Sequence, residues 1–327
     1  MSIVNSPLPY KRSDAKSYAR ANLQGVWGAI PYPFTPDDEL DEQGLRRNIR
    51  YYIDNKLLDG IYCGHFMSEF WALTTGERKR AAEIVIDECR GSVPLMVHTG
   101  HTSVKESVEL SHHAERLGAD YLAVGNPYFM ANDESQIYDY FRYISDRTEA
   151  ALLITNTGYT GVVLSPEMVS RLADLENIVA VKNSPPWPHT LETLRLAGDR
   201  IIVSHPDERN WYRLMVEFGI RVYMSSASPF LIQKPGHTLI KDYTALVFAG
   251  QVEEAARVAA SLDPARAVFE KWLREPWPRR RLIPIAYLKA WSELLDMVGG
   301  PVRAPLPQIT PSEREELRED LASAGLI

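Results

Sequence analysis

A lysine ends a short apolar stretch near the middle of the chain, and its surroundings suit amine chemistry. Residues 178–181 are all apolar and predict a buried strand, which Lys182 and the polar pair Asn183-Ser184 terminate. A lysine at such a strand end keeps its stem among apolar neighbours, where desolvation disfavours the ammonium form. The neutral amine is the form that attacks a carbonyl carbon to give a Schiff base. Lys182 is therefore a candidate nucleophile, and an ordinary lysine that simply reaches water is the alternative.

Seven other strand-like stretches also end in polar or aromatic residues. These ends are Tyr32, residues 65–69, 98–101, 126–129, 155–157 and 205–207, and the pair Ser225-Ser226. In a closed parallel barrel the carboxyl ends of all strands meet at one face, so we expect these side chains to surround Lys182. Hydroxyl and imidazole groups there could relay protons, and apolar neighbours could keep the amine neutral.

The elements that must position these residues alternate between strands and helices. The strand-like stretches are residues 26–30, 60–64, 93–98, 121–125, 151–155, 178–182, 201–204 and 221–225. Helix signals fill the intervals, including N-cap candidates at Asp41, at Thr74 or Thr75, and at Thr102 or Ser103. Eight such units of about thirty residues predict an α/β protein with a (β/α)8 TIM barrel. A doubly wound sheet is the alternative, but no Gly-rich dinucleotide fingerprint follows the first strand.

The pattern divides the chain into three parts. Residues 1–24 are predicted to form an N-terminal arm, and residues 25–228 carry the barrel strands and most of the barrel helices. After residue 228 the pattern is entirely helical, so residues 229–327 are predicted to form the last barrel helix and a C-terminal helical extension. The helices expected there span residues 239–249, 253–273, 284–298 and 312–324.

Bulk composition narrows the class of protein. The chain has 327 residues, of which 45% are hydrophobic and 24% charged, as is typical of soluble globular proteins. Its net charge of -7 and its lack of a long basic run argue against nucleic-acid binding. No apolar run reaches membrane-spanning length, and the two cysteines, Cys63 and Cys89, fit a reducing compartment. We therefore expect a cytoplasmic protein with small-molecule partners and with no metal or organic cofactor.

Several motifs occur along the chain in a defined order and spacing: AIPYPF (29–34), DGI (59–61), EFWALT (69–74), GAD (118–120), NPY (126–128), NIVAVK (177–182) and PVRAPL (301–306). Together they resemble the dihydrodipicolinate synthase / N-acetylneuraminate lyase family of class I (Schiff-base) aldolases and hydratases. The resemblance implies that Lys182 forms an imine with a 2-oxo acid, commonly pyruvate. It also implies that the barrel assembles as a homotetramer.

Three positions depart from the synthases of that family. HFMSE (65–69) replaces the Gly-Thr-Thr-Gly-Glu loop that holds the keto-acid carboxylate. Thr155 stands where a proton-relaying tyrosine usually ends strand five, and Phe129 replaces the partner tyrosine after strand four. The hydroxyl triad of the synthases is therefore absent, and ordinary dihydrodipicolinate synthase activity is not expected. Phe66 and Met67 would make that side of the pocket apolar.

Other departures resemble the aromatic hydratase-aldolase branch. Phe66 or Met67 falls near the phenylalanine of a Gly-Thr-Phe-Gly-Glu variant, and the segments around His205 and Ser225-Ser226 resemble that branch's Pro-His-Glu-Asp and Trp-Ser-Ser stretches. Those enzymes cleave arylidene pyruvates to an aromatic aldehyde and pyruvate through hydration and retro-aldol steps. The resemblance thus implies a carbon–carbon lyase on a 2-oxo acid with an aryl or other bulky substituent. A 2-oxo (sugar) acid dehydratase of the same family is the alternative.

Candidate roles follow from the strand ends and the resemblance together. Lys182 is the candidate nucleophile, and the candidates for proton transfer are Tyr32, Thr155, Tyr159 and His205. The candidates for substrate binding are Phe66, Met67, Ser68, Asn156, Phe129, Ser225 and Ser226. Each could instead be structural: a phenol can fill space and bond a backbone group, a histidine can be satisfied internally, and a serine or asparagine can cap a turn.

Two other classes of function remain open. Histidines at strand ends (His65, His98, His101 and His205) suggest a metal-dependent barrel hydrolase. Such a site needs three or four converging ligands, and the His-x-His pair typical of strand one in barrel hydrolases is absent here. A non-catalytic relative is the second possibility, and Lys182 argues against it because a desolvated lysine is costly to retain without use.

Overall fold

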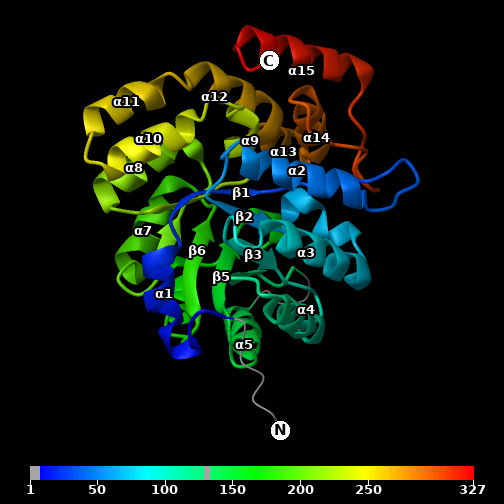
Figure 1. The fold of residues 1–327 in the computed structure, drawn as a ribbon. Helices are drawn as coiled ribbons and strands as arrows, with labels where there is room; N and C mark the ends of the chain where they lie inside the picture. Colours follow the sequence, from blue (N-terminus) through cyan, green and yellow to red (C-terminus); the bar gives the residue numbers. More distant parts are fainter. Residues whose placement is uncertain (1–7, 129–132) are drawn as a thin grey trace.

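Eight parallel strands form a near-closed barrel surrounded by helices in the structure of this protein, a computed structural model that describes residues 8–128 and 133–327 (Figure 1). Nearly every strand residue is buried, which explains why the strands are continuous apolar runs rather than alternating patterns. The (β/α)8 barrel expected from the sequence is therefore confirmed. The strands are β1 Gly25–Ala29, β2 Gly60–Cys63, β3 Leu95–His98, β4 Tyr121–Gly125, β5 Ala151–Asn156, β6 Ile178–Asn183, β7 Ile202–Ser204 and β8 Val222–Met224.

The strand order places the candidate lysine between two defined neighbours. The sheet runs β7-β6-β5-β4-β3-β2-β1-β8, and β1 pairs with both β2 and β8. Lys182 on β6 lies opposite Thr155 on β5 and Ser204 on β7. The barrel closes between β7 and β8 through a side chain, because the Ser204 hydroxyl donates to the Val222 carbonyl at 2.9 Å and accepts from the Met224 N–H at 3.0 Å.

Helix α1 lies in the N-terminal segment, and α2 to α8 follow the first seven strands. Asp41, Thr74 and Ser103 accept hydrogen bonds from backbone N–H groups at the starts of α2, α3 and α4, and these caps agree with the sequence expectation. Thr74 and Glu77 together form a complete capping box. The helices are α1 Ala15–Asn22, α2 Glu42–Asp54, α3 Thr75–Cys89, α4 Val104–Leu117, α5 Glu134–Ser145, α6 Pro166–Leu172, α7 Trp187–Ala197 and α8 Glu208–Phe218.

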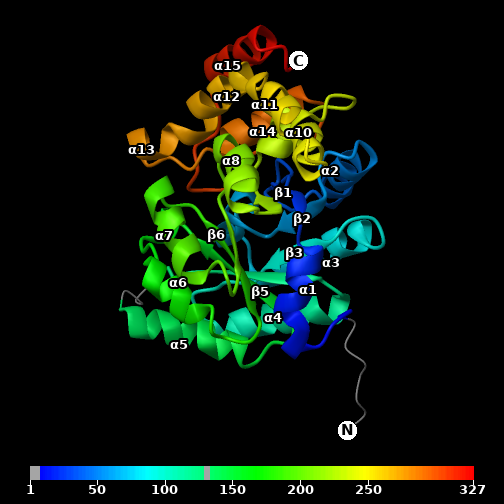
Figure 2. The ribbon, with the colours of Figure 1, turned by 90° about the vertical axis from the view of Figure 1, so that its left-hand side faces the viewer.

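The rest of the chain is helical, and its second half lies at one end of the molecule. Both views place α12, α14 and α15 there, at the end opposite α5 (Figures 1 and 2). None of the helices in the described part of the chain is long and apolar enough to cross a membrane. The elements are α9 Ser228–Ile232, α10 Leu239–Phe248, α11 Val252–Ala260, α12 Asp263–Phe269, a π-helical turn Glu270–Arg274, α13 Pro276–Arg280, α14 Ile285–Leu294 and α15 Pro311–Ser323.

One helix expected as continuous is divided. Residues 253–273 were predicted as a single helix, but α11 ends at Ala260 and α12 begins at Asp263. Pro264 lies in the first turn of α12, where its missing N–H costs nothing. A proline in the interior of a longer helix would remove a hydrogen bond and clash with the preceding turn, so the chain starts a new helix there.

The N-terminal segment contacts the barrel at the amino ends of the strands. The Tyr10 hydroxyl donates to the Asp120 carbonyl and accepts from the Ala151 N–H, each at 2.8 Å. These two backbone groups lie just before β4 and at the first residue of β5. Tyr10 therefore links the starts of two neighbouring strands, and the opposite end of the barrel, where the strands end, remains available for a site.

Candidate active site

Lys182 is buried at the carboxyl end of β6. Its side chain is 2% exposed, and its Nζ donates a hydrogen bond of 2.7 Å to the Ser225 carbonyl. The same nitrogen lies 5.4 Å from the centroid of the Tyr62 ring. Burial lowers the pKa of Lys182 from its ordinary value near 10.5 to about 7. A large share of this amine is therefore neutral and nucleophilic near pH 7.

A cavity of about 290 Å³ opens beside this amine. Among the described residues that line it none is Asp or Glu, while Arg274 places a guanidinium in the wall. The cavity is thus suited to an anionic small molecule. The strand-end loops contribute His65, Met67, Thr157, Gly158, Tyr159, Lys182, Ser184, His205, Pro206, Ser226 and Ala227, and the C-terminal segment contributes Phe269, Leu273, Arg274, Trp277, Pro284 and Leu288.

The structure brings five of the predicted site residues to the cavity wall, namely Lys182, Tyr159, His205, Met67 and Ser226. They come from the ends of five different strands, β2, β5, β6, β7 and β8. This convergence is the one that the barrel geometry predicts for residues that follow the strands.

Other predicted residues lie behind the lining. The Ser68 hydroxyl donates to the Ile30 carbonyl at 2.6 Å, and the Ser225 hydroxyl donates to the Trp27 carbonyl at 2.8 Å. The side-chain amide of Asn156 bonds both the N–H and the carbonyl of Leu164. These three polar groups are therefore used to hold loops, although Ser225 still reaches the chemistry through its backbone carbonyl.

The remaining predicted residues are aromatic or lie against an aromatic side chain. Tyr32 is fully buried beside Cys63, and burial raises the pKa of its hydroxyl well above the ordinary value. The Phe66 ring packs against Tyr159 with centroids 5.4 Å apart, so it supports the cavity wall from behind. Phe129 lies outside the described residues.

Thr155 is bonded to a tyrosine that sequence reasoning missed. The hydroxyls of Thr155 and Tyr62 lie 2.9 Å apart and are buried. Tyr62 reaches across from β2 to β5, so its ring fills the barrel interior below Lys182. The sequence places a tyrosine in a strand here, but it does not show which partner the phenol meets.

His65 is a second residue at the cavity that was not among the named catalytic candidates; the sequence placed it at a strand end, among imidazoles that could relay protons or bind a metal. Gly64 has a φ of +70°, which turns the chain sharply after β2 and places His65 in the cavity wall. The ring is 4% exposed, and neither of its nitrogens has a hydrogen-bond partner among the described residues. Burial first, and then the nearby Lys182, hold the pKa of His65 well below its usual range, so the imidazole is neutral.

His205 also lines the cavity, but both of its nitrogens are occupied. Nδ1 accepts a hydrogen bond from the Asp207 N–H at 3.1 Å, which leaves Nε2 to donate to the Pro185 carbonyl at 3.2 Å. Burial lowers the pKa of His205 to about 4, so this ring is neutral as well. Within residues 8–128 and 133–327, no group of three or more His, Cys, Asp or Glu side chains converges on a possible metal position.

An aromatic wall lies along the side of the cavity formed by the C-terminal segment. The Tyr159 and Trp277 rings meet edge to face with centroids 4.6 Å apart. Phe269 adds a third ring to the lining. Trp277 and Phe269 lie far from the barrel strands in sequence, and the residue order alone gave no signal that α12 and α13 would reach the site.

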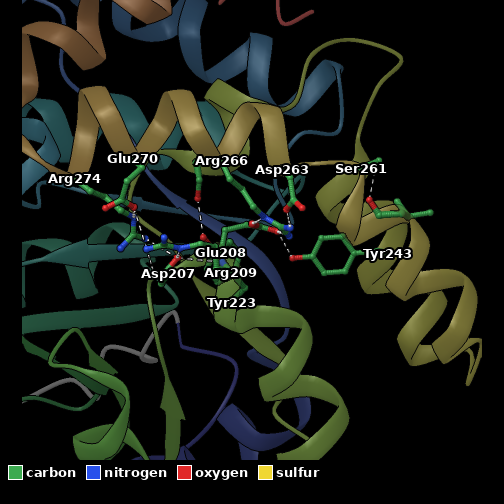
Figure 3. Close-up of polar contacts among 12 residues, drawn as sticks. Asp207, Glu208, Arg209, Tyr223, Tyr243, Ser261, Asp263, Arg266, Glu270 and Arg274 are labelled. Atoms are coloured by element: carbon green, nitrogen blue, oxygen red, sulfur yellow. Dashed lines mark hydrogen bonds and ion pairs between the residues drawn. The ribbon is translucent and has the colours of Figure 1, made fainter. Parts of the chain in front are cut away.

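A network of charged residues fixes this C-terminal segment to the loop after β7 (Figure 3). Asp207 contacts Arg274 at 3.0 Å and Arg209 at 3.1 Å, and Arg209 also contacts Glu270 at 3.0 Å. Burial alone would raise the pKa of Asp207, but the two arginines lower it overall. The carboxylate therefore stays ionised and holds Arg274 at the cavity wall.

The network continues through Glu208, the first residue of α8 (Figure 3). Arg266 forms a two-pronged contact with its carboxylate at 2.6 and 2.9 Å, and the Tyr243 hydroxyl donates to it at 2.7 Å. Two-pronged arginine–carboxylate pairs fix orientation as well as distance. The helices that carry the aromatic wall are thus held in a defined position against the barrel.

A buried ion pair anchors the loop after β2. Lys289 on α14 contacts Glu69 at 2.6 Å, and both side chains are at most 1% exposed. The backbone N–H of Arg303 donates to the same carboxylate at 2.9 Å, and Lys289 also donates to the Pro301 carbonyl at 2.7 Å. Burial lowers the pKa of Lys289 to about 8, although Glu69 opposes the shift. Glu69 therefore has an anchoring role and does not face the cavity.

Comparison with known proteins gives a consistent family. The model of the dihydrodipicolinate synthetase family matches residues 22–324. A 4-hydroxy-tetrahydrodipicolinate synthase of Pelobacter propionicus is 30% identical over 311 residues, which cover 93% of this chain and 100% of the relative. An N-acetylneuraminate lyase of Fusobacterium nucleatum is 34% identical over 188 residues, which cover 57% of this chain and 65% of the relative.

Solved structures agree with the fold. A prophage protein of the dihydrodipicolinic acid synthase family from E. coli K12, solved in complex with pyruvate, superposes with a TM-score of 0.81 at 24% identity and covers 93% of this chain and 99% of its own. The barrel, the lysine at the end of β6 and the family match over residues 22–324 lead to one conclusion. The chain belongs to the dihydrodipicolinate synthetase family, whose members are lyases of the class I, Schiff-base-forming aldolase type.

Proposed function

We propose that this protein is a carbon–carbon lyase that acts through a Lys182 imine on a 2-oxo acid with an aryl or other bulky substituent. The observation that carries the proposal is the buried Lys182 amine, whose pKa is about 7 and whose nitrogen lies at the cavity. An uncharged amine at this position can attack a ketone without first losing a proton to water.

The proposed reaction uses the imine to accept electrons. The Lys182 nitrogen bonds to the ketone carbon, and the ketone oxygen leaves as water. In a hydrated arylidene pyruvate, the C3–C4 bond then breaks and its electron pair moves toward the protonated imine. The C4 hydroxyl loses its proton and becomes the carbonyl of an aromatic aldehyde, while the enamine left on Lys182 takes up a proton at C3. Hydrolysis of the restored imine then releases pyruvate. Of the residues predicted to transfer protons, Tyr159 and His205 line the cavity beside Lys182.

The lining supports a substrate of this class. Tyr159, Trp277 and Phe269 offer flat apolar faces to an aryl group. Arg274 supplies a cation for a carboxylate, and no described lining residue carries a carboxylate that would repel it. Met67 lines the side where the family's synthases carry hydroxyl groups, which supports a bulky and less polar substrate.

Borohydride trapping tests the proposal directly. The protein is incubated with pyruvate or with an arylidene pyruvate, reduced, digested and analysed by mass spectrometry. We expect a reduced adduct on the peptide that contains Lys182 and none in the variants K182A and K182R. Lys289 is a matched control, because it is also buried with a lowered pKa but is paired with Glu69.

Two results would overturn the proposal. One is the absence of any adduct with every keto acid tried. The other is aldehyde release by K182A at the rate of the unchanged protein. Modification of Lys289 rather than Lys182 would equally move the chemistry away from the cavity described above.

A further inference from the structure

We propose that His65 is a catalytic residue that transfers protons during formation and hydrolysis of the Lys182 imine. The inference rests on the proposed function. In the family that this chain resembles, a tyrosine at the end of strand five transfers these protons, and Thr155 stands at that position here. We assign the proton transfer to His65 instead.

The first observation is the state of the imidazole. The His65 side chain is 4% exposed and lines the cavity. Neither of its ring nitrogens has a hydrogen-bond partner among the described residues. A buried polar group without a partner is costly, so native proteins rarely keep one without a reason. His65 lines the cavity, so a ligand there is the partner that could complete its hydrogen bonding, and a neutral imidazole has one donor and one acceptor.

The second observation is the position of the ring relative to the amine. His65 and Lys182 both lie against Tyr62: the two ring centroids are 4.6 Å apart, and the lysine Nζ is 5.4 Å from the Tyr62 centroid. Tyr62 is itself held by its hydrogen bond of 2.9 Å to Thr155. His65 and Lys182 also line the same cavity, so Tyr62 is a positioning residue that contacts both of them.

Other groups near the amine are less able to carry the proton. Both nitrogens of His205 are bonded to backbone groups, so this ring would have to break a hydrogen bond first. The Thr155 hydroxyl is bonded to Tyr62 and does not line the cavity. Tyr159 packs edge to face on Trp277, and burial raises the pKa of its hydroxyl, which makes it a poorer base at neutral pH.

The proton balance of imine formation matches one neutral imidazole. The amine attacks the ketone carbon, and the product carries a positive nitrogen and a negative oxygen. His65 takes a proton from that nitrogen and gives it to the oxygen, which yields the neutral carbinolamine. His65 then takes up a proton from solvent and gives it to the carbinolamine oxygen, the C–O bond breaks, water leaves and a protonated C=N bond remains. The oxygen has gained one proton from the nitrogen and one from solvent, the nitrogen keeps one hydrogen, and His65 ends in its starting state.

The test measures imine formation apart from carbon–carbon cleavage. H65Q keeps a polar side chain of similar size, and H98Q is the matched control, because His98 is buried 5.6 Å from His65 but does not line the cavity. Each protein is mixed with saturating pyruvate and quenched into borohydride at set times. We expect H65Q to form the Lys182 adduct about 100- to 10,000-fold more slowly, in line with the usual contribution of general acid–base catalysis, and H98Q to stay within about threefold of the unchanged protein.

A rescue experiment separates catalysis from structure. H65A removes the ring and leaves space beside the cavity, so added imidazole is expected to restore part of the trapping rate in H65A and not in H98Q. An adduct that forms at the unchanged rate in H65Q, or slow trapping in H65A that imidazole fails to raise, would overturn the role of His65. Failure of the unchanged protein to form any adduct would overturn the proposed function itself, so the two results are distinguishable.

Discussion

Burial, rather than a neighbouring charge, sets the pKa of Lys182. Its neighbours among the described residues include the Ser225 carbonyl, the Tyr62 ring and the neutral imidazole of His65, none of which is anionic. No carboxylate therefore offsets the cost of burying the ammonium form, and the pKa falls to about 7. The catalytic consequence is that the reactive form of the residue is abundant at neutral pH.

This environment predicts how imine formation depends on pH. Below pH 7 Lys182 is an ammonium ion and cannot attack, and above pH 7 it is a neutral amine, so the rate should rise with pH and level off through an inflection near 7. The measurement mixes protein and pyruvate at pH 5.5 to 9 and quenches every sample into borohydride at one fixed pH. A rate that keeps rising toward pH 10 would show that the amine has the pKa of an exposed lysine and would contradict the prediction.

The sequence predicted Lys182 as the nucleophile, but it did not name Tyr62 or His65 among the catalytic candidates. An apolar run that stops at a lysine is a local pattern, so the residue and its strand could be predicted together. Tyr62 and His65 lie about 120 residues before Lys182, and only closure of the barrel brings β2 next to β6 across the interior. The phenol expected at the end of strand five is replaced by one that reaches Thr155 from another strand, which no local pattern could reveal.

The C-terminal segment is the element that gives the cavity its aromatic side. Trp277 on α13 lines it and packs on Tyr159, while the Asp207–Arg274 contact holds the preceding π-helical turn in place. The sequence predicted helices here, but their contact with the active site depends on ion pairs between residues more than sixty positions apart. Such pairings are set by tertiary packing and leave no periodic signal.

Removing the indole tests whether this element selects the substrate. In W277L we expect the KM for an arylidene pyruvate to rise about 3- to 10-fold, because an aromatic pair contributes about 0.5–1.5 kcal/mol beyond its buried area. Trapping of pyruvate alone should change little, since pyruvate has no aryl group to contact the wall. The readout is steady-state cleavage followed by aldehyde absorbance.

A second tryptophan provides the control for this variant. Trp272 lies in the π-helical turn, bonds Asp320 at 2.8 Å and does not line the cavity. W272L is therefore expected to lower the melting temperature while leaving the KM for the aryl substrate unchanged. Equal KM values for W277L and the unchanged protein would mean that the substrate does not use the aromatic wall.

At the scale of the whole molecule, the side-chain hydroxyl of Ser204 joins strands β7 and β8 of the barrel. Ser204 Oγ bridges the Val222 carbonyl and the Met224 N–H between β7 and β8, and Ser204 is the register partner of Lys182. S204A removes the bridge and leaves two buried backbone groups without this partner, so we expect a loss of about 1–3 kcal/mol in the free energy of unfolding. Urea denaturation measures it, and the exposed S13A should stay within about 0.5 kcal/mol. An unchanged midpoint for S204A would show that the junction does not depend on the hydroxyl.

The architecture as a whole was more predictable than the site it builds. Eight apolar runs at regular intervals predict a barrel because each run is buried on both faces, and the observed strands agree within about two residues. β3 begins at Leu95 rather than at residue 93, since Pro94 has no N–H to donate to the ladder. The cavity needs the loops and the distant helices together, and the sequence therefore predicted five of its lining residues and missed the wall that α12 and α13 complete.

The contact between the Lys182 nitrogen and the Ser225 carbonyl has a consequence for the whole catalytic cycle. The free amine, the carbinolamine and the protonated iminium each keep at least one hydrogen on that nitrogen, so a single fixed oxygen at 2.7 Å can hold all three in the same place. The partial negative charge of that oxygen also favours the cationic iminium over the neutral forms. A main-chain atom has this task, and no side-chain substitution at residue 225 can delete it.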